Sequence, residues 1–202
     1  MQFIFFGTSN FSLIVLEGLI EASYKPILVI TSPDKPVGRK QIITPTPVAL
    51  LAKKNDIEIY KVEHFDSSVN KKIQKFNPVL GILASYGQIV PTSMLQLFSY
   101  GILNVHPSLL PKYRGPSPIQ TALLDGESKT GVSIIRLTEK MDAGPILNMQ
   151  NIEITLNDNY FSLEQKTAKV GAELLSSTIR PWLRNEIKAK EKKNQLLVIQ
   201  KC

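Results

Sequence analysis

Apolar residues fall into short continuous runs that alternate with segments of helical period. Runs such as residues 2–7 and 79–84 are rich in Phe, Ile, Leu and Val and have the length of a buried strand. In residues 11–20 the apolar side chains recur every three or four positions, which predicts a helix with Ser9 or Asn10 as its N-cap. Such alternation is typical of βαβ units. We therefore expect an α/β fold with a mainly parallel, twisted sheet flanked by helices.

The same patterns predict seven strands and six helices along the chain. The strands are expected at residues 2–7, 27–31, 57–60, 79–84, 102–106, 132–137 and 145–154. The helices are expected at residues 11–20, 48–55, 69–76, 92–97, 119–124 and 163–179. Pro181 is expected to end or bend the last helix.

One long segment, residues 32–47, is expected to lack regular structure. It contains Pro33, Pro36, Pro45 and Pro47 around Gly38, and proline removes backbone donors that helices and ladders need. A loop of this length inside a compact domain is usually functional.

Length and composition favour a single domain. The 202 residues, 43% hydrophobic and 20% charged, suffice for one α/β domain over residues 1–180, followed by a Lys-rich tail over 181–202 without a second domain. No apolar run approaches the roughly 20 residues of a membrane span, and the first strand begins without a presequence. We therefore expect a cytoplasmic protein that contacts no membrane. Cys202 is the only cysteine, which excludes an intramolecular disulfide and a Cys-rich metal site.

The formal net charge of +7 is concentrated in two places. Seven Lys and Arg but only two Glu lie in residues 180–202, and Lys35, Arg39 and Lys40 form a second cluster in the Pro-rich loop. Such an excess suits a polyanionic partner, although a Lys-rich tail is also typical of a solvated surface.

The residue types that carry chemistry gather around the strand at 102–106. Asn104 and His106 are two positions apart, so both side chains lie on the same side of that strand. An imidazole and an amide are donors that can stabilise a developing oxyanion, which points to acyl-type transfer. His64, the only other histidine, has no comparable neighbours and is expected on the surface.

A carboxylate follows in a second loop. Asp142 stands between Met141 and Ala143-Gly144-Pro145, where it either forms an Asx turn or orients the His106 imidazolium. Ser108 is not a hydrolase nucleophile because no Gly-x-Ser-x-Gly surrounds it. The turns that follow the strands are expected to meet at one crevice. The sequence after the first strand, GTSN, lacks the GxGxxG pattern of a dinucleotide site.

Residues 104–111 (NVHPSLLP) together with Asp142 resemble the signature of the 10-formyltetrahydrofolate-dependent formyltransferases. Residues 6–11 (FGTSNF), 33–40 (PDKPVGRK) and 113–120 (YRGPSPIQ) are similar, within that family, to the methionyl-tRNA formyltransferases. The resemblance runs from Met1 to about residue 179.

The resemblance implies a Rossmann-like formyltransferase fold and a transfer centre made of Asn104, His106 and Asp142. The formyl group of 10-formyltetrahydrofolate would pass to the amino group of initiator methionyl-tRNA, for translation initiation, in a monomeric enzyme without a metal. His106 and Asn104 would stabilise the tetrahedral oxyanion, and Asp142 would assist proton transfer.

The family also implies binding residues. The folate would be lined by Ser108, Leu109, Leu110 and Pro111, with Tyr86, Gly87 and Ile89 near its pterin ring. The acceptor and its tRNA would contact Thr8, Phe11, Lys35, Arg39 and Lys40.

Four alternatives remain open from the sequence. The amine acceptor could be glycinamide ribonucleotide or an amino sugar, or the chain could hydrolyse formyltetrahydrofolate. Residues 7–11 do not supply the Gly-rich phosphate loop that glycinamide ribonucleotide needs. The β-barrel domain that methionyl-tRNA formyltransferases normally carry has no counterpart in these 202 residues. The last alternative is therefore not an enzyme: a truncated remnant that binds folate or RNA without catalysis.

Overall fold

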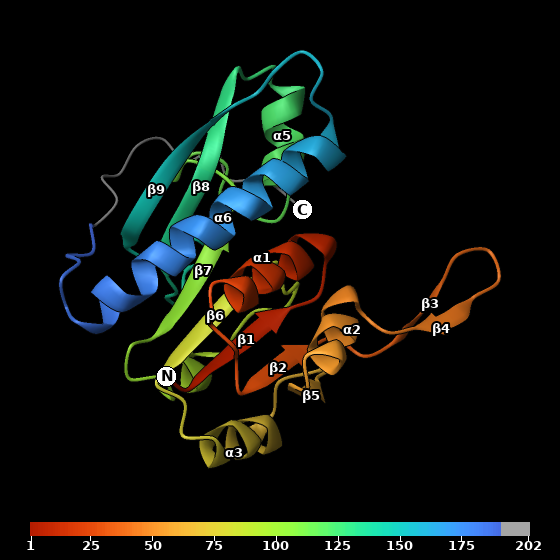
Figure 1. Ribbon diagram of the computed structural model, residues 1–202, viewed down its shortest axis with the longest axis vertical. Helices are drawn as coiled ribbons and strands as arrows, with labels where there is room; N and C mark the ends of the chain where they lie inside the picture. The colour runs from red at the N-terminus through yellow and green to blue at the C-terminus, as the bar shows by residue number, and fades with distance from the viewer. Residues whose placement is uncertain (191–202) are drawn as a thin grey trace. The chain divides into compact units, whose positions relative to one another are not determined.

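The computed structural model describes residues 1–190 (Figure 1). The chain forms two compact units, unit 1 (Met1–Gly101) and unit 2 (Ile102–Cys202), and each is described by itself. Residues 191–202, which include most of the predicted Lys-rich tail, lie outside the described residues.

Unit 1 is built on four parallel strands in the order β5-β2-β1-β6. Their bounds are β1 (Phe3–Gly7), β2 (Leu28–Thr31), β5 (Glu58–Lys61) and β6 (Leu80–Ala84). Every residue of β1 and β2 is buried, as expected for parallel strands that are covered on both faces. The carboxyl ends of all four strands meet at one edge of this sheet, where ligands of open α/β sheets bind.

Four helices accompany the strands of unit 1. They are α1 (Asn10–Glu21), α2 (Pro47–Lys54), α3 (Ser67–Lys75) and α4 (Thr92–Leu95). Ser9, one of the two N-caps that the sequence predicted, caps α1, and Ser12 completes a capping box. The Ser12 hydroxyl also donates to the Ala84 carbonyl at 2.6 Å, which ties the start of α1 to the end of β6.

The expectation that residues 32–47 lack regular structure is wrong. Two short antiparallel strands, β3 (Lys35–Val37) and β4 (Ile42–Thr44), form a hairpin that projects from unit 1 (Figure 1). Pro36 is tolerated because each strand of a two-stranded ribbon has one edge without ladder bonds, and a proline nitrogen can face that edge. Gly38, with φ of +72°, helps to close the turn.

Unit 2 contains three antiparallel strands in the order β7-β8-β9. The strands are β7 (Ile102–His106), β8 (Lys129–Arg136) and β9 (Ile146–Glu153), and the helices are α5 (Pro118–Leu124) and α6 (Tyr160–Leu183). Helix α6 packs along all three strands (Figure 1). A Cβ added to Gly171 of α6 would lie 2.7 Å from Val105 Cγ1, so this glycine allows the helix to approach β7 closely.

Helix α6 does not end before Pro181, although the sequence predicted an end at residue 179. The helix continues through Pro181 to Leu183. The proline lies in the last turn of the helix. Its missing N–H removes one hydrogen bond there, and the helix ends soon afterwards in any case.

The predicted α/β fold with a mainly parallel sheet and flanking helices is confirmed. Every predicted strand and helix is present, with ends that differ by at most four residues. Within residues 1–190, none of the helices combines the length and apolar character needed to cross a bilayer.

Unit 2 also yields a prediction about alkaline stability. Burial, and then the hydrogen bond from its hydroxyl to Glu164, raise the pKa of Tyr160 to about 12, whereas an unfolded tyrosine titrates near 10. The folded state therefore holds this proton more tightly. The stabilisation that comes from this tighter binding of the proton is complete below about pH 10 and is lost as the pH rises to about 12.

We expect the free energy of unfolding, measured with urea, to fall between about pH 10 and pH 12. The fall should be smaller in Tyr160→Phe, and equal falls in both proteins would contradict the assignment.

Candidate active site

Three polar side chains of unit 2 meet in a buried cluster: Asn104 and His106 from β7, and Asp142 from the connection between β8 and β9. Their exposed fractions are 7%, 4% and 9%. Asn104 Nδ2 donates to Asp142 Oδ1 at 3.2 Å, and His106 Nδ1 lies 3.6 Å from Asp142 Oδ2. The structure thus brings together the three residues that the sequence grouped, with both β7 side chains on the side that faces the carboxylate.

Asp142 is held by the backbone around it. Its φ is +45°, a left-handed conformation that aspartate tolerates better than most side chains. Its Oδ2 accepts a hydrogen bond of 2.9 Å from the Gly115 N–H. Close by, Gly144 passes so near the Arg136 carbonyl oxygen that an added Cβ would overlap it, at 1.8 Å. The loop is therefore built to hold one carboxylate in one place.

Both ring nitrogens of His106 face oxygen atoms. Nε2 lies 2.9 Å from the Tyr113 carbonyl oxygen, which can only accept, so Nε2 carries a hydrogen. Nδ1 faces the Asp142 carboxylate, and a hydrogen on Nδ1 makes that approach attractive. This geometry favours a doubly protonated imidazolium next to a carboxylate.

The loop between β7 and α5 is fixed by hydroxyl groups. Ser133 on β8 donates to the Ser108 carbonyl at 2.7 Å and accepts from the Leu110 N–H at 3.1 Å. Ser108 Oγ in turn donates to the Lys112 carbonyl at 2.6 Å. The sequence analysis missed Ser133, and it also missed the two backbone groups at Tyr113 and Gly115. Backbone groups are the same in every residue, so a sequence cannot indicate which of them are used. Ser133 could have been noticed only as a polar residue inside an apolar strand.

The proposed folate-lining residues differ in what they expose. Ser108, Leu110 and Tyr86 are buried, Leu109 and Pro111 are half-buried, and Gly87 and Ile89 are exposed, Ile89 to 78%. The Ser108 hydroxyl is already used inside unit 2. A ligand beside residues 108–111 would therefore meet mainly backbone and the apolar surfaces of Leu109 and Pro111.

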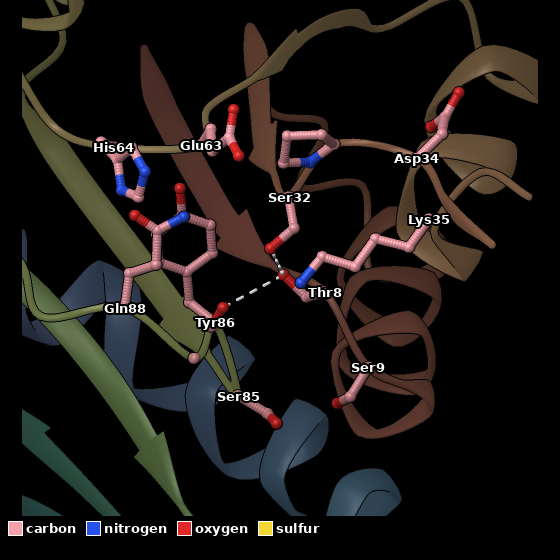
Figure 2. Close-up of a pocket in the computed structure, with 12 residues that line it drawn as sticks. Thr8, Ser9, Ser32, Asp34, Lys35, Glu63, His64, Ser85, Tyr86 and Gln88 are labelled. Atoms are coloured by element: carbon pink, nitrogen blue, oxygen red, sulfur yellow. Dashed lines mark hydrogen bonds between the residues drawn. The ribbon is translucent and has the colours of Figure 1, made fainter. Parts of the chain in front are cut away.

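Unit 1 has a cavity of about 640 Å³ at the carboxyl ends of its strands (Figure 2). Thr8, Lys35, Tyr86 and Gly87, four of the predicted binding residues, line it. Thr8 Oγ1 donates to the Tyr86 carbonyl at 3.1 Å. Phe11 does not line the cavity: its side chain is buried in the core, 3% exposed.

The other lining residues are mostly polar. They are Ser9, Ser32, Pro33, Asp34, Glu63, His64, Ser85 and Gln88. His64 is exposed, as predicted, and it contributes to this wall. Burial raises the pKa of the Tyr86 phenol, whose hydroxyl has no hydrogen-bond partner. Lys35 adds a positive charge to the lining of the cavity (Figure 2).

The basic residues of the Pro-rich segment lie on the projecting hairpin. Lys35 is in β3, while Arg39 and Lys40 are in its turn, and all three are exposed. Val37, Ile42 and Ile43 of the hairpin are also exposed, at 56%, 61% and 62%. The hairpin therefore presents cations and apolar side chains together. Within residues 1–190, no group of three or more His, Cys, Asp or Glu side chains is arranged to hold a metal ion.

Comparison with known proteins identifies the family. A sequence profile described as "Formyl transferase" matches residues 1–179. The chain belongs to the formyl transferase family. It is 42% identical over 197 residues to methionyl-tRNA formyltransferase of Halalkalibacterium halodurans, which covers 97% of this chain and 62% of that protein. It is 44% identical over 179 residues to the same enzyme of Staphylococcus aureus strain Newman, with 88% and 57% covered. The chain thus spans about 60% of the length of these relatives.

Solved formyltransferase structures share the fold. Phosphoribosylglycinamide formyltransferase from Bacillus halodurans superposes with a TM-score of 0.76 at 22% identity, with 92% of this chain and 97% of that one covered. An N-formyltransferase from Helicobacter canadensis, solved with folinic acid and dTDP-3-aminofucose, gives a TM-score of 0.72 at 21% identity, with 96% and 67% covered. The formyltransferase fold predicted from the sequence is confirmed. Members of this family use folate formyl donors.

Proposed function

We propose that the protein transfers the formyl group of 10-formyltetrahydrofolate to the amino group of initiator methionyl-tRNA, and so serves translation initiation in the cytoplasm. The observation that carries the proposal is the buried contact of Asn104 and His106 with Asp142. The names of the relatives at 42% and 44% identity support the choice of acceptor. We assign catalysis to residues 1–180, acting as a monomer.

The reaction begins when the acceptor nitrogen attacks the formyl carbon. A carbon–nitrogen bond forms, the carbonyl oxygen becomes negative, and a tetrahedral intermediate results. Asn104 Nδ2 carries two hydrogens, one of which binds Asp142, and the second is the donor we assign to the oxyanion. One such donor is worth about 3 kcal/mol of transition-state stabilisation.

His106 is the second donor. Its Nε2–H points at the Tyr113 carbonyl, and we propose that it turns from that carbonyl to the oxyanion as the intermediate forms. The Asp142 carboxylate, 3.6 Å from Nδ1, favours the protonated ring over the neutral one, and the protonated ring is the stronger donor.

Protons are exchanged as the intermediate collapses. The attacking amine loses one proton, the bond from the formyl carbon to the folate nitrogen breaks, and that nitrogen gains a proton. Asp142 is the nearby base that accepts the amine's proton, directly or through water. The folate itself supplies the activated formyl group, and we assign its binding to residues 108–111 and to Tyr86, Gly87 and Ile89.

We assign contact with the tRNA to the hairpin and to the cavity of unit 1. Lys35, Arg39 and Lys40 offer cations to phosphates, and the cavity wall at Thr8 receives the acceptor end. Phe11, which is buried, would support this wall from behind rather than touch the acceptor. Binding through a few lysine and arginine contacts should weaken steeply as salt increases.

The acceptor is tested directly with the whole chain. We expect formylation of methionyl-tRNA from 10-formyltetrahydrofolate, with little turnover of glycinamide ribonucleotide or a dTDP-amino sugar. Arg39→Ala should raise the KM for the tRNA about tenfold, whereas Lys71→Ala, an exposed lysine on α3, should leave it unchanged. Turnover of another acceptor alone, release of formate without any acceptor, or folate binding without turnover would each overturn the proposal.

A further inference from the structure

Tyr113 lies in the loop after β7, and its phenol is held by two carboxylates. Its hydroxyl is 2.8 Å from Asp125 Oδ2 and 2.8 Å from Glu127 Oε1, and its single hydrogen is shared between these two acceptors. Lys112 forms an ion pair with Glu127, and its ammonium lies 5.0 Å from the centre of the Tyr113 ring. The side chain is 2% exposed. Burial and these two carboxylates raise the pKa of Tyr113, so the phenol remains a donor at neutral pH.

The backbone of the same residue reaches the candidate active site. The Tyr113 carbonyl accepts the Nε2–H of His106 at 2.9 Å. Two residues later, the Gly115 N–H binds Asp142. One short segment therefore contacts both His106 and Asp142 through main-chain atoms.

Tyr113 adopts a φ of +57°, a left-handed conformation that is rare for a bulky side chain. Such a conformation is strained and persists only where its surroundings hold it. The strongest restraint on Tyr113 outside its own backbone is the hydrogen that its hydroxyl shares between Asp125 and Glu127, because hydrogen bonds to charged acceptors are the stronger kind.

We propose that Tyr113 is a positioning residue, and that the Asp125–Glu127 carboxylate pair, by holding its phenol, places its carbonyl to keep a hydrogen on His106 Nε2. The proposal rests on the role proposed for His106 in the transfer reaction. Without the phenol contacts, Tyr113 can relax from the left-handed conformation, and its carbonyl turns away from the ring. The ring then loses the acceptor that stabilises the hydrogen on Nε2, so Nε2 is deprotonated in part of the molecules.

Nitrogen NMR of the imidazole rings tests this without any substrate. The chain has only two histidines, so exposed His64 is an internal reference and His64→Gln assigns the spectrum. In the wild type we expect the His106 Nε2 signal of a protonated nitrogen. In Tyr113→Phe we expect that signal to move toward an average of protonated and unprotonated nitrogen, with His64 unchanged. An unchanged His106 signal in a folded Tyr113→Phe protein would overturn the proposal.

A matched pair of double variants tests the same positioning role without changing Tyr113 itself. Asp125→Ala with Glu127→Ala removes both acceptors, whereas Asp125→Asn with Glu127→Gln keeps an acceptor oxygen at each place. Asp125 is exposed and Glu127 is half-buried, so both variants should fold. We expect the alanine pair to reproduce the Tyr113→Phe spectrum and the amide pair to keep the wild-type one. Identical spectra for the two double variants would contradict the positioning of Tyr113 by Asp125 and Glu127.

Kinetics supply the second readout. Tyr113→Phe should lower kcat about 10- to 100-fold with little change in either KM, because a displaced catalytic group affects the transition state more than binding. Adding the alanine pair to Tyr113→Phe should cause little further loss, since both changes break the same contact. If the spectra change as expected but no acceptor is formylated, the proposed function fails and the positioning role stands. If transfer proceeds and the spectra do not change, the positioning role fails alone.

Discussion

Replacing Asp142 by asparagine is expected to lower kcat for formyl transfer about 10³-fold or more. The amide keeps the size of the side chain and tolerates the φ of +45°. It can still accept from the Gly115 N–H or from Asn104. It loses the negative charge that faces His106 and the base that accepts the amine's proton. Loss of a carboxylate that supports a catalytic imidazolium costs about 10⁴-fold in serine proteases, which sets the scale.

The measurement is a single-turnover rate of formyl transfer at saturating substrates, with urea unfolding of the same protein. The free energy of unfolding should change by less than about 2 kcal/mol, since the shape is retained. Asp158→Asn is the matched control: this carboxylate lies at the start of α6 beside Lys166, and its loss should affect stability but not kcat. A rate for Asp142→Asn within tenfold of the wild type would remove Asp142 from the mechanism.

Gly131→Ala is expected to lower the free energy of unfolding by about 3 kcal/mol or more. An added Cβ would lie 2.2 Å from the carbonyl oxygen of Gln150 and 2.4 Å from Leu109 Cδ2. Gln150 belongs to the neighbouring strand β9, so its carbonyl cannot rotate aside without breaking the ladder between β8 and β9. Because a typical domain is stable by only about 5–15 kcal/mol, the loss should be evident.

Urea denaturation gives the comparison, with Gly126→Ala as the control. Gly126 has a φ of +65° but open space around it, so alanine there suffers backbone strain without a clash. That strain should cost about 1 kcal/mol. Equal midpoints for the two variants would show that β8 can shift to admit the methyl group. Formyl transfer by Gly131→Ala should fall as well, since Leu109 belongs to the segment assigned to the folate.

Much of the fold could be predicted from short sequence patterns, because the formation of a buried strand or an amphipathic helix depends on neighbouring residues. The continuous apolar run of β1 and the three- to four-residue period of α1 mark a buried strand and an amphipathic helix whatever surrounds them. The hairpin of β3 and β4 was not predicted because its prolines argue against a strand. Only the pairing of the two segments shows that each strand has one edge without ladder hydrogen bonds, where a proline is tolerated.

Pro181 was a similar case. A proline is read from sequence as a helix end, yet near the end of α6 it costs a single hydrogen bond. The packing of α6 along β7, β8 and β9 outweighs that loss. Such a balance involves residues far along the chain, which a local pattern does not contain.

Asn104 and His106 could be placed on one side of a strand from the sequence alone, since side chains alternate along any strand. The carboxylate of Asp142 and the basic segment with Arg39 were also evident there. Which atoms meet depends on contacts between distant parts of the chain. The pairing of β7 with β8 and the turn before β9 bring Asp142 to Nδ1 of His106, and the left-handed Tyr113 brings a carbonyl to Nε2 of the same ring. These contacts join backbone and side-chain atoms across a folded loop, and every residue has the same backbone groups, so no sequence pattern encodes them.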